Sequence, residues 1–303
     1  MKRQNVALMA LLIAAVGAAG VAYAQVEVEI TSQEVVPGIY MLQGQGGNMG
    51  LAVGPDATIL IDDQFAPLTD KIVAAAAAVS ERPIDFLINT HWHGDHTGGN
   101  ENLGEQGAWI VAHENVRVRM SSPQFVEMFN MRSGAAPEVA KPSVTFDDSI
   151  TLHLNGDSIQ VVHVPRGHTD SDSIVYFETA DVLHMGDTYF AGTFPFIDVP
   201  NMGTLAGAVK AVAKALELTG PDTRVIPGHG PLSNRTELEA YRDMLAGVHA
   251  AVSQLVSAGK TRDEVIAAGP TAAWDEAFGG GFFTPEIFAG LAYDSVVAEA
   301  ATQ

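Results

Sequence analysis

The first half of the chain carries short apolar runs of the kind that form β-strands. Residues 26–30 alternate apolar and acidic side chains, and residues 38–42, 49–53 and 57–61 are apolar runs separated by turns that contain glycine. The run at 57–61 is apolar apart from Thr58, which is typical of a strand buried on both faces. An alanine-rich stretch from about Thr69 to Ser80 then predicts a helix.

Strands and helices continue to alternate along the chain. The apolar run 84–88 predicts another buried strand, and it leads directly into the polar segment 90–100. Residues 109–112 predict a further strand, followed by a helix over 113–120. The stretch 121–143 contains several prolines among apolar residues and predicts a long loop, and loops of this length are often functional.

The second half has the same mixture with longer helices. Four further strands are predicted, at 150–154, 158–164, 173–177 and 182–185. A helix that begins near Thr204 is predicted to end at Gly220-Pro221. Another follows an apparent capping box at Thr236-x-x-Glu239, and a third begins at Thr284 with Pro285 in its first turn. This mixture predicts a layered α/β fold in which helices cover sheets.

The first 24 residues have the layout of a secretory signal peptide. Lys2 and Arg3 precede an apolar run over 6–22, and Ala22-Tyr23-Ala24 supplies a cleavage site with small flanking residues. We therefore expect residues 1–24 to be removed and the mature chain, residues 25–303, to be periplasmic or secreted without stable membrane insertion. The alternative is a single retained membrane anchor, for which the apolar run is slightly short.

Composition excludes several classes of function. The chain has 16 Lys+Arg against 36 Asp+Glu, a formal charge of −20, and loss of Lys2 and Arg3 would take it to −20 − 2 = −22. Nucleic acid is excluded as a partner because its phosphates require clustered Lys and Arg. The chain also contains no cysteine, which excludes disulfides, thiolate nucleophiles and Cys-ligated metals.

The segment His91-Trp92-His93-Gly94-Asp95-His96 carries the clearest chemical signal. Three imidazoles and one carboxylate within six residues match the ligands that zinc and related divalent metals prefer. His91 and His93 are two residues apart after a strand, so both can face one metal. Asp95 and His96 are adjacent on a turn and can hold a second metal nearby.

Three further residues lie next to glycine at predicted strand ends. They are His168 in Arg166-Gly167-His168, Asp187 in Met185-Gly186-Asp187 and His229 in Pro227-Gly228-His229-Gly230. Together with the first segment they supply seven possible ligands, and a carboxylate such as Asp187 can bridge two cations. Two neighbouring metals can generate a hydroxide nucleophile and stabilise both ends of a displacement.

This motif set resembles the metallo-β-lactamase-fold superfamily, in particular its exported bacterial β-lactamase-like zinc hydrolases. The resemblance covers the mature chain to about residue 232: Asp62 after a buried strand, the H-x-H-x-D-H run, and then Gly-His, Gly-Asp and Gly-His in order. It implies a four-layer αββα sandwich with the metals at one edge of the sheets. Residues 233–303 would form a helical C-terminal part of the same domain.

The resemblance also implies a role for each candidate ligand. His91, His93 and His168 would bind a first Zn²⁺, and Asp95, His96 and His229 a second, so that the chain holds two zinc ions. Asp187 would bridge them. Asp62 would support a ligand without touching metal, although a simple turn residue is an equally good interpretation of it.

The mechanism expected for such a site is hydrolysis of a small molecule. A hydroxide bound to the metals and held by Asp95 would attack the carbonyl of a cyclic amide, which makes β-lactamase activity the leading hypothesis. Tyr189 is a candidate oxyanion donor, or else a packed aromatic residue at a strand end. The apolar runs at 194–196 and 125–131 and the turn at 44–50 are candidates for lining the mouth over an uncharged ring.

Two alternatives are compatible with the sequence. A lactonase or another ester hydrolase of the same fold is favoured by Asp187, which departs from the pattern of the His-rich β-lactamase subclass. A periplasmic metal-binding or redox partner with little hydrolytic activity is the alternative of a different class. The substrate is thus expected to be a lactam or a lactone, and the sequence carries no signal for an oligomeric state.

Overall fold

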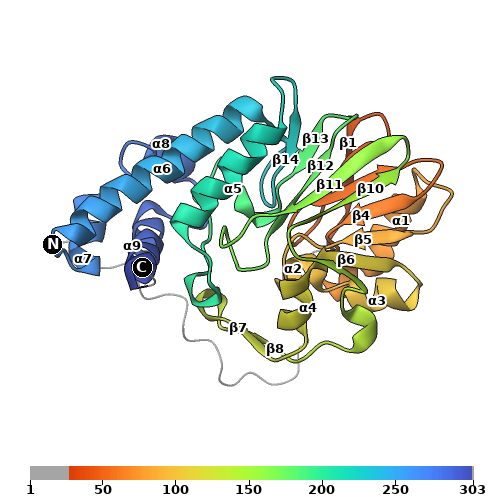
Figure 1. Cartoon of the computed structure of the whole chain (residues 1–303), viewed down its shortest axis with the longest axis horizontal. Helices are drawn as coiled ribbons and strands as arrows, with labels where there is room; N and C mark the ends of the chain where they lie inside the picture. Colours follow the sequence, from red (N-terminus) through yellow and green to blue (C-terminus); the bar gives the residue numbers. More distant parts are fainter. Residues whose placement is uncertain (1–26, 302–303) are drawn as a thin grey trace, which may run out of the picture.

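The computed structural model describes residues 27–301 and contains two β-sheets that face each other, with helices outside both (Figure 1). The predicted signal peptide, residues 1–24, lies outside the described residues. Among the residues that are described, no helix combines the length and apolar character needed to cross a lipid bilayer.

The first sheet has seven strands in the order β1-β2-β3-β4-β5-β6-β9. They are β1 (Thr31–Val36), β2 (Ile39–Gln43), β3 (Met49–Val53), β4 (Thr58–Ile61), β5 (Phe86–Ile88), β6 (Trp109–His113) and β9 (Val144–Phe146). Strands β1 to β4 pair as an antiparallel meander, and β4, β5, β6 and β9 run parallel. Because the parallel strands share one direction, the loops that follow β4 and β5 leave the same edge of the sheet.

The second sheet has six strands in sequence order. They are β10 (Ser149–Leu154), β11 (Asp157–His163), β12 (Ser173–Phe177), β13 (Val182–His184), β14 (Arg224–Ile226) and β15 (Ser233–Asn234). Neighbouring strands are antiparallel except for β13 and β14, which run parallel and are joined through a helix.

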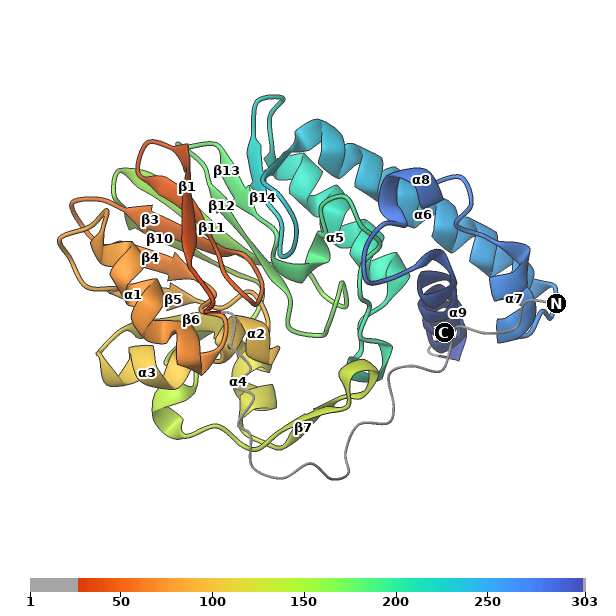
Figure 2. The same cartoon turned by 180° about the vertical axis from the view of Figure 1, so that it is seen from behind.

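Three apolar clusters hold the layers together. The inner cluster joins the facing sheets, with Ile61 and Val111 from the first and Val175 and Phe177 from the second. The outer clusters hold α1 (Thr69–Ala77) and α3 (Asn100–Glu105) on the first sheet, and α5 (Leu205–Leu218) and α6 (Arg235–Ser257) on the second. Figure 2 shows the resulting helix–sheet–sheet–helix order. The predicted αββα sandwich is confirmed.

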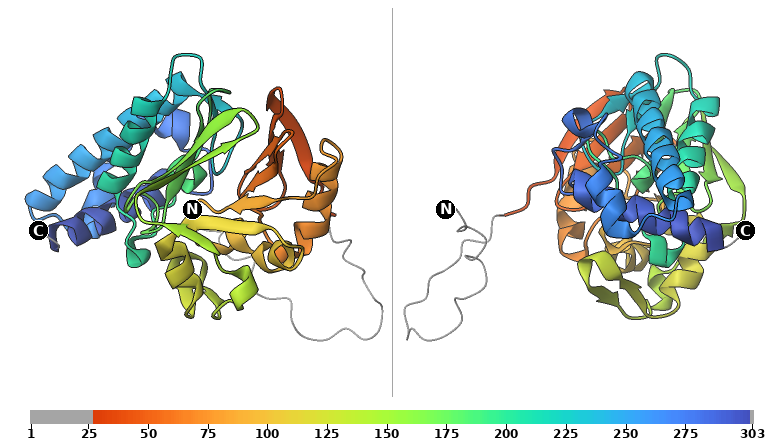
Figure 3. Two further views of the ribbon diagram at one scale, coloured as in Figure 1. Left: turned by 45° about the vertical axis from the view of Figure 1, so that its right-hand side comes forward. Right: turned by 90° about the vertical axis from the view of Figure 1, so that its left-hand side faces the viewer.

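The C-terminal region packs against the second sheet. It contains α6, α7 (Arg262–Ala268), α8 (Asp275–Phe278) and α9 (Pro285–Ala301), and Figure 3 shows these helices gathered on the side opposite α1. Leu245 of α6 and Phe288 of α9 belong to the same apolar cluster as Leu183 of β13. The helical C-terminal part therefore shares a core with the sandwich.

Several local predictions are wrong. Residues 27–30 form no strand, and the first strand is Thr31–Val36, whose pairing with β2 decides its position. Helix α6 begins at Arg235 and is capped by Asn234, so Thr236 does not start a capping box. A true capping box joins Thr261 and Glu264 at α7.

The stretch 121–143 is not a simple loop. It contains a two-stranded hairpin of β7 (Gln124–Val126) and β8 (Met131–Ser133), joined by a short 3-10 turn. Helices begin after Leu68, at Leu205 after the cap Thr204, and at Pro285, as the pattern predicts.

Candidate metal centre

The polar residues of the H-x-H-x-D-H segment follow directly from strand β5. The chain leaves β5 at Ile88, passes His91, and enters the one-turn helix α2 (Gly94–Thr97) with His93 as its N-cap residue in an extended conformation. Asp95 and His96 lie on that turn. Main-chain bonds from His96 and Thr97 to the carbonyl of His93 close the turn and fix the spacing of the four side chains.

The other three candidates come from the second sheet. His168 lies in the turn between β11 and β12, and Asp187 lies in a 3-10 turn, Gly186–Thr188, directly after β13. His229 follows β14 and forms a bridge with Phe190. Because β13 and β14 are parallel, the turns that follow them meet at one edge of the second sheet. This edge lies beside α2, since side chains from both sheets approach one another there.

His91, His93 and His168 form a first group of possible ligands whose nitrogen atoms lie within 4.8 Å of one another. The closest atoms are His93 Nδ1 and His168 Nε2, at 2.9 Å. The imidazole rings of His93 and His168 are nearly perpendicular, with centroids 4.7 Å apart. All three side chains are buried, which suits neutral imidazoles that converge on one point.

Asp95, His96 and His229 form a second group on the same scale. Asp95 Oδ2 lies 3.6 Å from His96 Nε2 and 3.5 Å from His229 Nε2. The side chains of Asp95 and His229 are 28% and 33% exposed, whereas His96 is fully buried. Solvent therefore reaches the cluster from the side of Asp95 and His229.

Asp187 lies between the two groups. Its Oδ2 is 3.6 Å from His168 Nε2, 4.0 Å from His91 Nε2 and 3.3 Å from His229 Nε2. Its Oδ1 is 3.1 Å from His96 Nε2. The structure thus brings together the seven residues predicted from the sequence, with Asp187 next to members of both groups.

The chemistry of this cluster fits divalent metal ions. His91 Nε2, His96 Nε2 and Asp187 Oδ1 are buried and make no hydrogen bond, although the last two are only 3.1 Å apart. An unpaired buried polar atom costs about 1–3 kcal/mol, so three of them together need a partner. Imidazole nitrogens and carboxylates at these separations are the donor set that zinc and neighbouring metals accept.

Burial and the neighbouring charges shift the pKa values of several residues in the cluster. Burial acts to raise the pKa of Asp95, but the charge of His96 and the contact with His229 outweigh it and bring that pKa to about 2. Burial opposes protonation of His229, yet the Asp187 and Asp95 carboxylates raise its pKa to about 9. Burial lowers the pKa of His168 to about 4, against the pull of Asp187.

The second ligand group has a buried carboxylate behind it. Asp62, at the end of β4, accepts Thr90 N and Thr90 Oγ1 and places Oδ2 2.7 Å from His96 Nδ1. Its backbone is left-handed, with φ of 59°, a conformation tolerated where the surroundings fix it. A carboxylate behind a histidine sets the ring orientation and directs its second nitrogen toward a metal.

A family model of the metallo-beta-lactamase superfamily matches residues 42–230, which is more than half of the chain and includes the whole cluster. The chain belongs to the metallo-beta-lactamase superfamily. The resemblance read from the motifs is thereby confirmed. The helical region after residue 230 lies outside the match.

Curated relatives of this superfamily member are distant. A beta-lactamase-like protein 2 homolog of Caenorhabditis elegans is 24% identical over 66% of this chain and 60% of its own length. A UPF0173 metal-dependent hydrolase of Pyrococcus horikoshii is 28% identical over 60% of this chain and 81% of its own length. The chain thus spans less than two thirds of the nematode relative. Some of its relatives are named as metal-dependent hydrolases.

Solved structures show the same superfamily fold. A metallo-beta-lactamase from Pontibacter korlensis has a TM-score of 0.59 at 18% identity and covers 72% of this chain and 99% of its own. The DIM-1 metallo-beta-lactamase has a TM-score of 0.60 at 18% identity, with 73% and 99% covered. At 18% identity, these two structures show that the chain shares their fold.

A second supporting carboxylate, besides Asp62, lies behind His93 and was not predicted from the sequence. Asp198 Oδ2 lies 2.9 Å from His93 Nε2, and Asp198 is 1% exposed. Asn201 Nδ2 donates to the same oxygen at 2.8 Å, and Arg119 donates to Asn201 Oδ1. The available signal was an acidic residue directly after the apolar run that ends at Ile197, a position where a carboxylate needs a buried partner.

Asp172 anchors the loop that carries His168. Its carboxylate accepts the main-chain N–H groups of His168 and Thr169, at 2.6 and 2.8 Å, and the Thr169 hydroxyl at 2.7 Å. Burial raises the pKa of Asp172 to about 7, and these donors oppose the rise. The three donors fix the turn, and with it the direction of the His168 ring.

Tyr189 lies in the core of the second half of the molecule. Its side chain is 1% exposed, and its hydroxyl is 2.7 Å from Ser233 Oγ. Its ring packs on Tyr241 with centroids 4.8 Å apart. These contacts match the packing interpretation of Tyr189 and give its hydroxyl a protein partner, so we do not assign it a role in the reaction.

The turn between β2 and β3 covers the second ligand group. Gly47 N donates to the Asp95 carbonyl, and Gln64 Nε2 donates to the Gly47 carbonyl. A Cβ atom on Gly47 would lie 2.2 Å from His96 Cε1. Only glycine therefore fits at position 47 against the imidazole of His96.

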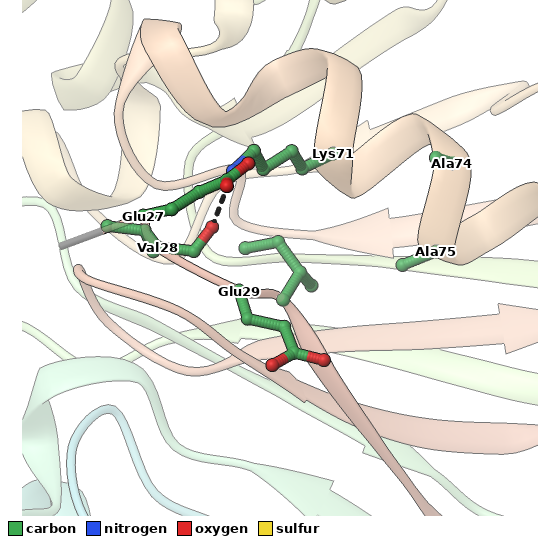
Figure 4. A pocket seen from close by; sticks show the side chains of 7 residues that line it. Glu27, Val28, Glu29, Lys71, Ala74 and Ala75 are labelled. Atoms are coloured by element: carbon green, nitrogen blue, oxygen red, sulfur yellow. Dashed lines mark hydrogen bonds and ion pairs between the residues drawn. The ribbon is translucent and has the colours of Figure 1, made fainter. Parts of the chain in front are cut away.

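A separate cavity of about 560 Å³ lies at the first described residues and carries no such chemistry (Figure 4). Glu27, Val28 and Lys71 are among the residues that line it, and Lys71 Nζ is 2.9 Å from Glu27 Oε1 and 2.8 Å from the Val28 carbonyl. None of its lining residues belongs to the metal cluster.

Proposed function

We propose that the chain is an exported hydrolase that uses two zinc ions to open a cyclic amide, with β-lactams as the first class of substrate to test. The single observation that carries this proposal is the pair of ligand groups that lie on either side of Asp187, each within 4.8 Å across its ligand atoms. Two such groups suit two neighbouring divalent ions.

The proposed ligands follow the two groups. His91, His93 and His168 would hold the first ion, and the residues of the second group, Asp95, His96 and His229, the other, with Asp187 between them. When bound, these ions supply Lewis acidity, which acidifies water and polarises a carbonyl group. The burial of five of the seven ligands keeps their nitrogens and oxygens free of competing water.

Asp95 has the position of a residue that orients the attacking water. Its carboxylate is partly exposed, and its pKa of about 2 keeps it ionised at neutral pH. An ionised carboxylate accepts a hydrogen bond and fixes a water molecule, but it is too weak a base to store a proton. Asp95 Oδ2 would therefore aim the water toward the carbonyl carbon.

The proposed reaction requires no nucleophilic side chain. The chain has no cysteine. Direct attack by water on the carbonyl carbon would break the ring C–N bond and give a ring-opened product with a carboxylate and an amine, without an acyl-enzyme. Export is supported by the signal-peptide layout of residues 1–24, and a periplasmic location exposes the enzyme to antibiotics.

A second candidate is hydrolysis of a lactone or another ester. The position of Asp187 between the two groups favours it, because a bridging carboxylate is the feature that the resemblance associates with lactonase, glyoxalase and phosphodiesterase branches. The alcohol oxygen of an ester is also a better leaving group than the nitrogen of an amide, so the same residues would suffice.

The test is hydrolysis of a chromogenic cephalosporin by purified protein loaded with zinc, with Asp95→Ala as the control. We expect kcat/KM above roughly 10⁴ M⁻¹s⁻¹, the low end of ordinary enzymes, and loss of that activity in the variant. A value orders of magnitude lower, with zinc bound and lactones hydrolysed instead, would overturn the amide proposal in favour of the ester one.

A further inference from the structure

Aromatic rings lie directly against the histidines of the metal centre. The Phe190 ring stacks on His229, with centroids 5.0 Å apart and planes at 21°. The Phe196 ring lies 5.3 Å from His168 and 6.2 Å from His93. These two phenylalanines therefore border both ligand groups.

A third ring reaches the same place from the C-terminal region. Phe283 stacks on Phe196 with centroids 5.7 Å apart and planes at 4°, and its centroid is 6.4 Å from that of Phe190. Phe283 belongs to the turn between α8 and α9, far beyond the family match, which ends at residue 230. The turn is seated on Thr193, since a Cβ on Gly281 would lie 2.6 Å from Thr193 Cγ2.

The outer edge of this ring cluster is open to solvent. Phe282 is 69% exposed and Phe129, from the β7–β8 hairpin, is 43% exposed, and their ring centroids are 6.1 Å apart. Phe129 also contacts Phe196 at 5.2 Å. Exposed aromatic side chains that continue a buried cluster mark a surface that binds an apolar partner.

The polar groups around these rings do not favour an anionic ligand. A cavity of about 460 Å³ adjoins Phe196 and is lined by Met128 and Leu291 together with Glu127, Asp198 and Asp294. The one cation that lines it, Arg262, is held by Asp294 at 3.1 Å. The cluster is thus apolar with acidic neighbours, which disfavours carboxylate or phosphate groups.

We propose that Phe129, Phe196, Phe282 and Phe283 form a subsite that binds an uncharged apolar substituent, an aryl or acyl group, of the substrate. The inference rests on the proposed function for its placement next to the scissile bond. It assigns to the C-terminal region, through the turn that carries Phe282 and Phe283, the selection of substrate. The apolar group is held by ring contacts and by release of water from the exposed rings.

Binding of two unreactive lactams tests the subsite without any reaction. N-benzyl-2-pyrrolidinone and N-methyl-2-pyrrolidinone differ only in the apolar group, and calorimetry on the zinc-loaded protein gives both affinities. We expect the benzyl compound to bind more tightly, and Phe282→Ala to reduce the ratio of the two affinities about tenfold. Since Phe282 is mostly exposed, this variant keeps its folded core.

Trp109→Ala is the matched control. Trp109 is 57% exposed at the first residue of β6, outside the ring cluster, so its removal should leave the affinity ratio unchanged. Equal affinities of the two lactams for the unmodified protein, or an unchanged ratio in Phe282→Ala, would overturn the subsite.

Kinetics then separate this inference from the proposed function. Penicillin-type substrates with phenylacetyl and acetyl side chains are compared, and Phe282→Ala is expected to raise KM for the first selectively while kcat changes little. Discrimination in binding without hydrolysis of either substrate would contradict the proposed function and leave the subsite standing. Hydrolysis of both with equal KM would contradict the subsite alone.

Discussion

Asp198 Oδ2 lies 2.9 Å from His93 Nε2, and both side chains are buried. The pair mirrors that of Asp62 and His96, which are 2.7 Å apart behind the other ligand group. Each proposed metal site therefore has one histidine whose outer nitrogen faces a carboxylate. In each pair the carboxylate fixes the tautomer, so that the inner nitrogen, Nδ1 of His93 or Nε2 of His96, is free to bind a metal.

Asp198→Asn is expected to weaken zinc binding at the first site about 10- to 100-fold, the usual effect of losing such a support. The amide keeps the shape of the side chain and loses its charge, so folding should be retained. Competition with a chromophoric chelator measures the affinity. Asp294→Asn, which changes an exposed partner of Arg262, is the control. Unchanged affinity in Asp198→Asn would show that Asp198 does not act through His93.

Asp187→Asn should affect both proposed ions at once. Asp187 faces His168 and His91 through one oxygen and His96 through the other, so its neutralisation removes a ligand from each group. We expect the affinity for zinc to fall by more than about 100-fold, beyond the effect of a supporting residue. Elemental analysis of the purified variant gives the zinc content. Full content in this variant would contradict the bridging assignment.

Gly47→Ala tests the contact between the β2–β3 turn and His96. The new methyl group would lie 2.2 Å from His96 Cε1, so the ring or the turn must move. We expect weaker zinc binding and a loss of about 1–3 kcal/mol in the free energy of unfolding. Gly94→Ala is the comparison, because a Cβ there meets nothing within 4 Å although Gly94 lies between two proposed ligands. Equal behaviour of the two variants would refute the steric argument.

Removal of metal should destabilise the protein. Without a cation, the buried atoms His91 Nε2, His96 Nε2 and Asp187 Oδ1 have no hydrogen-bond partner, and binding of an ion to the folded state alone adds stability by mass action. Treatment with EDTA is therefore expected to lower Tm by roughly 5 °C or more, and added zinc should restore it. The Asp95→Ala variant should show a smaller shift, and a Tm insensitive to EDTA in the unmodified protein would count against a structural contribution from the ions.

The proposed ligands were predictable from the sequence because they follow local rules. Each of His168, Asp187 and His229 lies beside a glycine at the end of a strand, and parallel pairing of β13 with β14 brings two of these turns together. The role of Asp198 was not predictable, since it depends on a partner, His93, that lies 105 residues away in the sequence. Nothing in the local pattern near Asp198 specifies His93.

The wrong predictions of local structure also arise because contacts beyond the local pattern decide where these elements begin. Residues 26–30 alternate as a strand should, but pairing with β2 places the strand at Thr31–Val36. Thr236 and Glu239 have the spacing of a capping box, yet Asn234 accepts Glu237 N and starts α6 two residues earlier. The ring cluster at Phe283 was also not predictable from the sequence, because it joins segments that only the packing of α8 and α9 brings to the candidate metal centre.

A last prediction concerns stability in acid. His113 and His163 stack face to face between the two sheets, with centroids 3.6 Å apart and planes at 11°. Burial lowers the pKa of both, and the charge of His113 lowers that of His163 further. His113 Nδ1 accepts the N–H of Asn115 and so caps α4 (Glu114–Met120), and His163 Nδ1 faces the Asp172 carbonyl.

The lowered pKa values determine how folding stability changes with pH. The unfolded chain, with an ordinary histidine pKa near 6.5, binds more protons than the folded one, so stability falls as the pH drops through 6.5. The nearby acidic groups that oppose the shift are Glu114, Asp147, Asp148 and Asp170. They reduce the effect without reversing its direction, since both pKa values remain lowered.

Urea unfolding at pH 7.5 and 5.5 measures the effect. We expect the unmodified protein to lose stability on acidification, and His163→Gln to lose less, because the variant removes one of the two histidines whose pKa is lowered by folding. His153→Gln changes an exposed histidine of β10 and should leave the pH dependence as it is. The stacked pair is not the source of acid sensitivity if both variants follow the unmodified protein, because only His163→Gln removes the second positive charge from the stack.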